Sequence, residues 1–199
     1  MPQKGKTKRP EALLPRLTLV LARIAEVVHW CAAGVMVIAA TAAIIWPVWF
    51  GEWIDQTFLH GETNLACYGW EVAVARAGEM PSQGMLVCFM IGAAVMLALM
   101  AMIFRNVYLI LKTAQGKTWF AKGDTPFQKN IVRMFREIGI FFIATAVLSL
   151  ISEIIVNIGG GELGAGFNYL GCFIGLVFLC ISQFFNYGTS LEKDLDGLV

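Results

Sequence analysis

The sequence is poor in charged residues and in histidine. Only 15% of its 199 residues are charged, two are histidines, and the formal net charge is +1. This near-neutral balance says nothing about nucleic-acid binding. The basic start of the chain is better explained as a topology signal than as a nucleic-acid arm, so we expect no direct nucleic-acid binding. With 58% hydrophobic residues and a mean hydropathy of +0.69, the chain is also too apolar for an ordinary globular surface. An ordinary soluble domain is therefore excluded.

Familiar catalytic and metal-binding motifs are absent as well. The chain has no HExxH, GxSxG or CxxC motif, and a whole hydrophobic run separates His29 from His60. The glycine-rich stretch 159–166 lacks the lysine of a phosphate-binding loop and is better explained as a hairpin turn. We therefore predict that the protein is not an enzyme and needs no cofactor or metal.

Four long hydrophobic runs dominate what is present. They occupy residues 27–50, 84–104, 138–158 and 163–191, and the predicted spans within them are about 27–50, 84–104, 138–158 and 167–187. A helix rises about 1.5 Å per residue, so roughly 20 apolar residues cross about 30 Å of hydrocarbon. The first run is too long for a cleaved signal peptide and should remain as a helix. The pattern predicts an all-α integral membrane four-helix bundle, with one membrane domain over 27–191.

The basic residues favour one topology for these helices. Six of them precede the first run and seven lie between the second and third runs. In the loop 51–83, by contrast, five of the six charged residues are acidic. Because short loops rich in lysine and arginine stay in the cytoplasm, both termini are predicted to be cytoplasmic. Residues 1–26 then form a basic segment, in which apolar positions over 13–24 predict a short interfacial helix. Residues 192–199 form an acidic cytoplasmic tail.

Two smaller features leave alternatives open. Cys67 in the outer loop could form a disulfide with Cys88 or Cys172, and the sequence does not supply the separation that decides this. Small residues at Gly171 and Gly175, and at 92–94, could let helices approach closely. Packing within the chain is the favoured explanation for both patches, although a homo-oligomer remains an alternative.

The connection 115–139 carries the clearest local pattern. Thr125, Pro126 and Gln128 have the character of a helix start, so the third membrane helix is predicted to begin in the cytoplasm. Apolar residues from 127 to 138 fall on one face of this helix, and basic residues lie nearer the other. Packing on the bilayer or on other helices is favoured over a specific protein-docking surface.

Two segments resemble a known family. These are PFQKNIVRMFREIG at 126–139 and FFNYGTSLEKDLDGLV at 184–199, within the four-helix layout of the whole chain. Together they are similar to the bacterial membrane family called domain of unknown function 2975, although Met134 and Phe135 replace a more usual leucine-arginine pair. The resemblance implies a multi-pass protein of the bacterial inner membrane, with no known reaction. It also implies a link to small helix-turn-helix regulators, which are often encoded beside such proteins.

The implied function is therefore to hold or modulate a cytosolic transcription regulator at the membrane. The candidate partner-binding residues combine the basic connection with the acidic tail. They are Lys122, Phe127, Lys129, Asn130, Arg133, Arg136, Glu192, Asp194 and Asp196. Salt bridges between the tail and the basic loop within one chain are the simpler alternative, each worth about 0 to 1 kcal/mol when exposed.

A small transporter or channel subunit is the alternative function. Its evidence is the set of polar residues in or beside the spans, above all Glu153 and Asn157 in the third run. An ionisable group inside a bilayer is a functional hypothesis by default. Solvation of Glu153 near the outer interface, or hydrogen bonding between helices, is the simpler explanation.

Overall fold

The computed structural model describes residues 13–60, 62–75, 78–119, 128–158 and 168–196, and it is mostly helical. Four helices are long: α1 (Leu13–Ile45), α3 (Gln83–Ala114), α4 (Lys129–Ile158) and α5 (Tyr169–Asp196). Each is long and apolar enough to cross a membrane. The prediction of four long apolar helices is thus confirmed.

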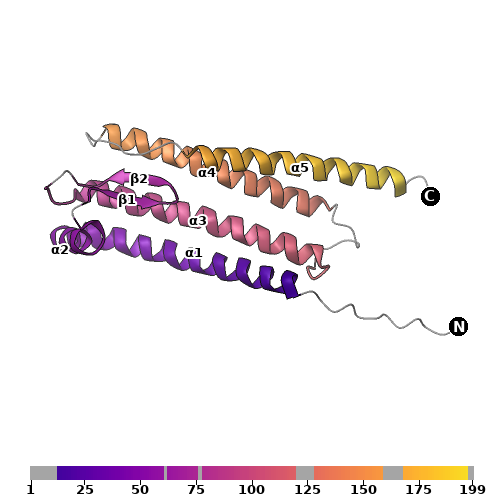
Figure 1. Cartoon of the computed structure of the whole chain (residues 1–199), viewed down its shortest axis with the longest axis horizontal. Helices are drawn as coiled ribbons and strands as arrows, with labels where there is room; N and C mark the ends of the chain where they lie inside the picture. Colours follow the sequence, from indigo (N-terminus) through magenta and orange to yellow (C-terminus); the bar gives the residue numbers. More distant parts are fainter. Residues whose placement is uncertain (1–12, 61, 76–77, 120–127, 159–167, 197–199) are drawn as a thin grey trace.

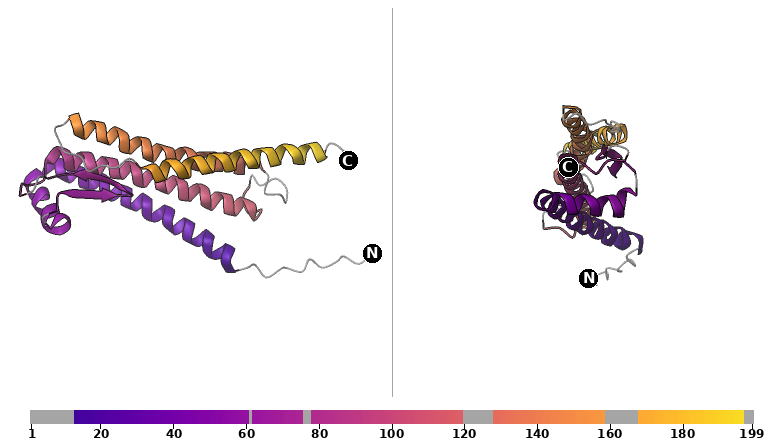
Figure 2. Two further views of the ribbon diagram at one scale, coloured as in Figure 1. Left: turned by 45° about the horizontal axis from the view of Figure 1, so that its top comes forward. Right: turned by 90° about the vertical axis from the view of Figure 1, so that its left-hand side faces the viewer.

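The long helices lie side by side in a row (Figures 1 and 2). Extensive packing joins α1 with α3, α3 with α4, and α4 with α5. α1 begins and α5 ends at one end of the row, which we call the termini end, and a small hairpin lies toward the other, which we call the hairpin end (Figure 1). α3 is the most buried of the four helices, because it packs between α1 and α4 and is also in contact with the hairpin.

The boundaries of α1 differ from those expected. The short interfacial helix expected over 13–24 is not a separate element. These residues form the first part of α1, which is continuous from Leu13. At its other end α1 stops at Ile45 rather than continuing to residue 50. Trp46 has non-helical angles (φ −127°, ψ 65°), since the residue before a proline is disfavoured in the α region, and Pro47 then starts α2 (Pro47–Ile54).

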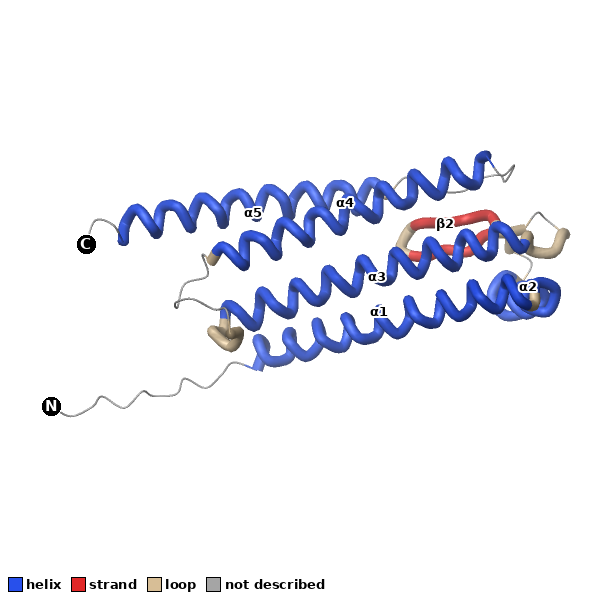
Figure 3. The backbone as a smooth tube through the Cα atoms, turned by 180° about the vertical axis from the view of Figure 1, so that it is seen from behind, coloured by secondary structure: helices blue, strands red, loops and turns tan. Residues whose placement is uncertain are grey.

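The loop between the first two long helices is folded, which the sequence did not predict. After α2, a π-helix η1 (Asp55–Leu59) leads to two antiparallel strands, β1 (Asn64–Cys67) and β2 (Trp70–Ala73). The turn residues Tyr68 and Gly69 both have positive φ, as in the tight turns that suit hairpins. The fold is therefore not purely α-helical, and Figure 3 shows the hairpin lying alongside the helices.

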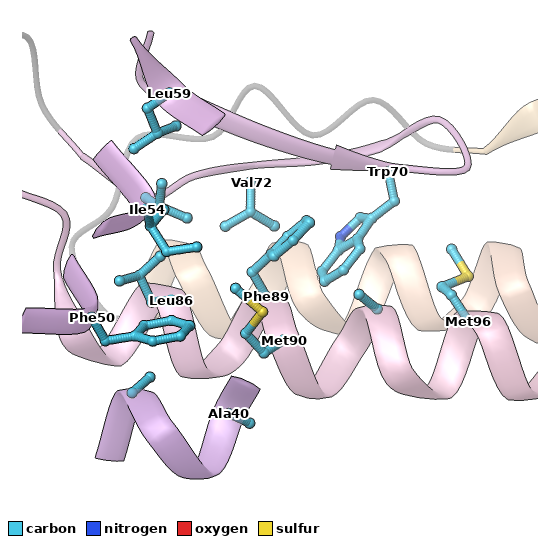
Figure 4. Packing of buried hydrophobic residues seen from close by; sticks show 13 residues of the cluster. Ala40, Phe50, Ile54, Leu59, Trp70, Val72, Leu86, Phe89, Met90 and Met96 are labelled. Atoms are coloured by element: carbon cyan, nitrogen blue, oxygen red, sulfur yellow. The ribbon is translucent and has the colours of Figure 1, made fainter. Parts of the chain in front are cut away.

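A hydrophobic core forms where the hairpin covers α3 (Figure 4). Trp70 is fully buried and stacks on Phe89 of α3, with ring centroids 5.2 Å apart. Its indole lies directly over Gly92, where a Cβ atom would be only 2.2 Å from the ring. At the hairpin tip, the Tyr68 hydroxyl pairs with Nε2 of His29 on α1. The hairpin is thus held against both α1 and α3.

The two C-terminal helices approach through small residues. A Cβ atom on Gly139 would lie 2.8 Å from the Gly175 carbonyl oxygen, and one on Gly171 would lie 2.9 Å from Thr145 Oγ1. These contacts, like that of Gly92, confirm that the glycine patches pack within the chain. Only ten residues of α4 precede Gly139, whereas 21 residues of α5 follow Gly175, so α5 projects beyond the start of α4 (Figure 1).

Candidate binding groove between α3 and α4

A groove of about 710 Å³ opens between α3 and α4 at the termini end. Charged and amide side chains border it because polar residues follow the hydrophobic run of α3 and precede that of α4. Antiparallel packing brings these two polar ends together. The lining residues are Met102, Arg105, Asn106, Leu109, Trp119, Asn130, Arg133, Met134, Glu137, Ile140 and Phe141.

Glu137 is the centre of the polar part of this groove. Its Oε1 accepts a hydrogen bond from Arg133 Nε at 2.7 Å, and its Oε2 accepts one from Asn106 Nδ2 at 3.2 Å. Asn106 is buried on α3, so its contact ties the two helices together. The Arg133 side chain remains 71% exposed, which leaves most of this cation accessible to a ligand.

The margin of the groove adds a second cation and an aromatic ring. Arg105 is exposed, and Trp119 is 95% exposed. A tryptophan with almost all of its surface accessible is unusual, because this large side chain is highly buried on average and favours interfaces. Two guanidinium groups against one carboxylate leave the groove with an excess of positive charge. The arrangement suits a ligand that combines a negative group with apolar surface.

The predicted partner-binding residues fall in different places. Asn130 and Arg133 line the groove. Lys129 and Arg136 do not line the groove, but they are exposed and share a helix face with Arg133, so the three form an exposed basic row on α4. On the projecting end of α5, Glu192 is half-buried and Asp194 is exposed, and neither lines the groove. Lys122, Phe127 and the side chain of Asp196 lie outside the described residues.

Of the eleven residues that line the groove, only Asn130 and Arg133 were predicted as part of a partner surface. The missed residues include the exposed Trp119 and three polar or charged ones: Arg105, Asn106 and Glu137. In the sequence, Asn106 is a polar residue that borders the second hydrophobic run. The signal for Glu137 was present, because an acid four residues after Arg133 and next to an apolar run is suited to an ion pair. Its second bond crosses to α3 and depends on helix register, which the sequence does not reveal.

The residues proposed for transport lie far from this groove. Glu153 is half-buried on α4, 16 residues after Glu137, which corresponds to about 24 Å along a helix. It does not line this groove or the cleft between α1 and α3. Nearby buried hydroxyls are already satisfied, since Ser149 and Ser152 donate to carbonyls of their own helix. The side chain of Asn157 lies outside the described residues.

The thiols and possible metal ligands form no cluster in the described part of the chain. Cys67, Cys88 and Cys172 are all free thiols, so neither of the disulfides considered for Cys67 is formed. Burial raises the pKa of the Cys67 thiol above its ordinary value. Across the described ranges, no group of three or more histidine, cysteine or acidic side chains could hold a metal ion.

Comparisons with protein-family models, with curated proteins and with solved structures gave no match to this chain.

Proposed function

We propose that this chain is a multi-pass protein of the bacterial inner membrane with both termini in the cytoplasm. Four helices that are long and apolar enough to cross a bilayer support insertion. The even number of crossings puts the two termini on one side, and the excess of lysine and arginine in residues 1–26 and 105–136 favours the cytoplasm for that side.

On this topology, the groove and the exposed basic row form a cytoplasmic binding surface. The observation that supports it best is the cluster of Glu137, Arg133 and Asn106 beside the exposed ring of Trp119. Glu137 holds Arg133 in place, so less conformational freedom is lost when a partner carboxylate binds. Exposed tryptophan and arginine are the residue types that most often dominate binding energy at protein interfaces.

The proposed partner is a small cytosolic helix-turn-helix regulator, as the resemblance to domain of unknown function 2975 implies. The positive surface would bind an acidic face of that regulator and hold it at the membrane. DNA-binding faces are basic and would be repelled by the groove. In this proposal, the exposed Asp194, with Glu192 nearby on the projecting end of α5, would contact such a basic face instead. The regulator would thereby be kept from DNA.

The first experiment is recovery of the partner from mildly solubilised native membranes, followed by mass spectrometry. Wild-type protein is compared with a variant in which Lys129, Arg133 and Arg136 are all replaced by alanine. We expect a helix-turn-helix protein to be recovered with the wild type and to be lost from the variant. The recovered regulator is then purified, and its affinity for the wild type is measured directly.

The control removes the same number of positive charges from the same side of the membrane. Lys4, Lys6 and Lys8 are replaced by alanine, which leaves the groove unchanged. Membrane content is measured for all three proteins, because loss of basic residues can alter insertion. Equal recovery of the regulator by the wild type and the Lys129/Arg133/Arg136 variant would contradict the proposal.

A transporter or channel subunit is the second candidate, and it rests on the half-buried Glu153 in the third candidate span. A row of helices packed in chain order gives this candidate less support than the groove gives the first. It predicts that Glu153→Gln abolishes a flux of ions or solutes in reconstituted vesicles. Normal flux in that variant would remove Glu153 from the candidate site.

A further inference from the structure

A second cleft, of about 380 Å³, lies between α1 and α3 at the termini end. Three of its lining residues are basic: Arg23 from α1, Lys112 from the last turn of α3, and Lys117 just after it. The other lining residues are Leu19, Val20, Ile24 and Tyr108. The cleft therefore combines a basic rim with an apolar wall.

Two of the cations lie close to the ring of Tyr108. The guanidinium carbon of Arg23 and the ammonium nitrogen of Lys112 each lie 5.6 Å from the centre of its ring. Arg23 is also paired with the buried carboxylate of Glu26 at 2.6 Å. That pair offsets one positive charge, and the lining of the cleft contains three basic residues and no acidic one. Like charges held near one ring repel each other, so an anion placed among them is stabilised.

The apolar wall indicates what kind of anion fits. Val20 and Ile24 are each 54% exposed, and the exposed apolar face of α1 continues through Val27 and Val28. A free inorganic anion has no apolar part that could bury this surface. An anionic phospholipid has both parts, because its phosphate can lie among the basic residues while its acyl chains follow the face of α1.

We propose that this cleft binds the headgroup of an anionic phospholipid from the leaflet at the termini end. The proposal rests on the membrane insertion proposed above. Arg23 lies one turn before the hydrophobic run that starts at Val27, which places the cleft near headgroup level when that run spans the hydrocarbon. Basic pockets between membrane helices on the cytoplasmic side bind such headgroups.

The test variant replaces Lys112 and Lys117 with glutamine, which keeps the Arg23–Glu26 pair intact. The control replaces Lys129 and Arg136 with glutamine, which removes the same charge at the same end of the row but outside the cleft. Each protein is purified in neutral detergent and titrated with phosphatidylglycerol or phosphatidylcholine, and bound lipid is counted by native mass spectrometry. Extraction of membranes with alkaline carbonate reports insertion separately, so a failure of insertion is distinguishable from a failure of lipid binding.

We expect the wild type and the control to retain phosphatidylglycerol in preference to phosphatidylcholine. The cleft variant should bind phosphatidylglycerol about 30-fold more weakly, since each lysine near a membrane surface contributes about fivefold. Equal retention by the wild type and the cleft variant would overturn the proposal, and so would an equal loss in the control. Competition by millimolar inorganic phosphate would also overturn it, because the site would then recognise free phosphate rather than lipid.

Discussion

Glu137 illustrates how one side chain serves both the fold and the groove. It accepts one bond from Arg133, a largely exposed residue on the same helix, and one from Asn106, a buried residue on α3. The first bond is an exposed ion pair within one helix, and water screens such a pair, so it contributes little to stability. The second satisfies a buried donor, whose loss of a partner costs about 1 to 3 kcal/mol. The helix-to-helix bond therefore outweighs the ion pair.

This difference predicts that Glu137→Ala destabilises the protein by about 1 to 3 kcal/mol, whereas Arg133→Ala has a much smaller effect because its ion pair is exposed to water. Unfolding of both variants in detergent micelles, followed by circular dichroism, measures the two costs. A near-neutral Arg133→Ala matters for the function, because any loss of partner binding in that variant then reflects the surface. If both changes lowered the free energy of unfolding equally, the hydrogen bond from Asn106 to Glu137 would make no separate contribution to stability.

The Cys67 thiol supplies a pH-dependent prediction. Burial raises its pKa in the folded protein, and the thiolate is the form that reacts with alkylating reagents. At a given alkaline pH, folded Cys67 should hold less thiolate than the unfolded chain. Folded-state stability should also fall as the pH rises above the pKa of the unfolded thiol, because the folded state holds this proton more tightly.

The measurement uses a variant in which the other four cysteines are replaced by alanine. The rate of iodoacetamide labelling is followed against pH, in mild detergent and after unfolding in dodecyl sulfate. We expect the folded curve to reach half of its maximum at a higher pH than the unfolded curve. Superimposable curves would show that the hairpin does not shield this thiol.

At the scale of elements, the hairpin depends on one glycine of α3. Gly92 lies so close to Trp70 that an added Cβ atom would sit 2.2 Å from the indole. Trp70 is fully buried and stacked on Phe89, so it cannot move without displacing β2. We expect Gly92→Ala to destabilise the protein by about 1 to 3 kcal/mol, as overpacking of a core does.

Gly84→Ala is the matched control for this change. Gly84 lies on the same helix with nothing within 4 Å of the added Cβ, so alanine there should be neutral or stabilising by up to about 1 kcal/mol. Thermal unfolding in detergent micelles compares the two variants. Protease cleavage within residues 60–82 reports whether the hairpin has been displaced. If Gly92→Ala behaves like Gly84→Ala, the packing of Trp70 on α3 is not as close as described.

The elements also show what the sequence could and could not predict. The four long helices were predictable because uninterrupted apolar runs of this length have few alternatives to a membrane helix. The hairpin was missed because its strands have only four residues each and its Tyr68–Gly69 turn is a weaker signal than Asn-Gly. Within the groove, Arg133 was predicted from the helical pattern of basic residues, and Asn130 from the resemblance of segment 126–139 to a known family. The role of Glu137 depends on which residues of α3 face it, and local periodicity carries no such information.

At the scale of the whole molecule, the hairpin limits how the chain can sit in a bilayer. The tip at Tyr68 reaches His29, which lies 16 residues before the end of α1, or about 24 Å along that helix. The hairpin therefore extends along much of the roughly 30 Å that a bilayer core occupies. A two-stranded sheet has open edges, and open edges do not face hydrocarbon. We infer that the exposed side of the hairpin is accessible to water in the inserted protein.

This inference predicts the labelling pattern of single cysteines in an otherwise cysteine-free chain. Glu71→Cys, on the exposed side of β2, should react with a membrane-impermeant maleimide from the same side as His60→Cys. Lys129→Cys should react only from the opposite side, because α4 begins at the termini end. Ile38→Cys is the control, since Ile38 is 70% exposed on the apolar face of α1 and should face lipid. It should stay unlabelled until detergent is added. Labelling of Glu71→Cys from the Lys129 side would overturn the proposed topology, whereas protection from both sides would mean that lipid or protein covers the hairpin.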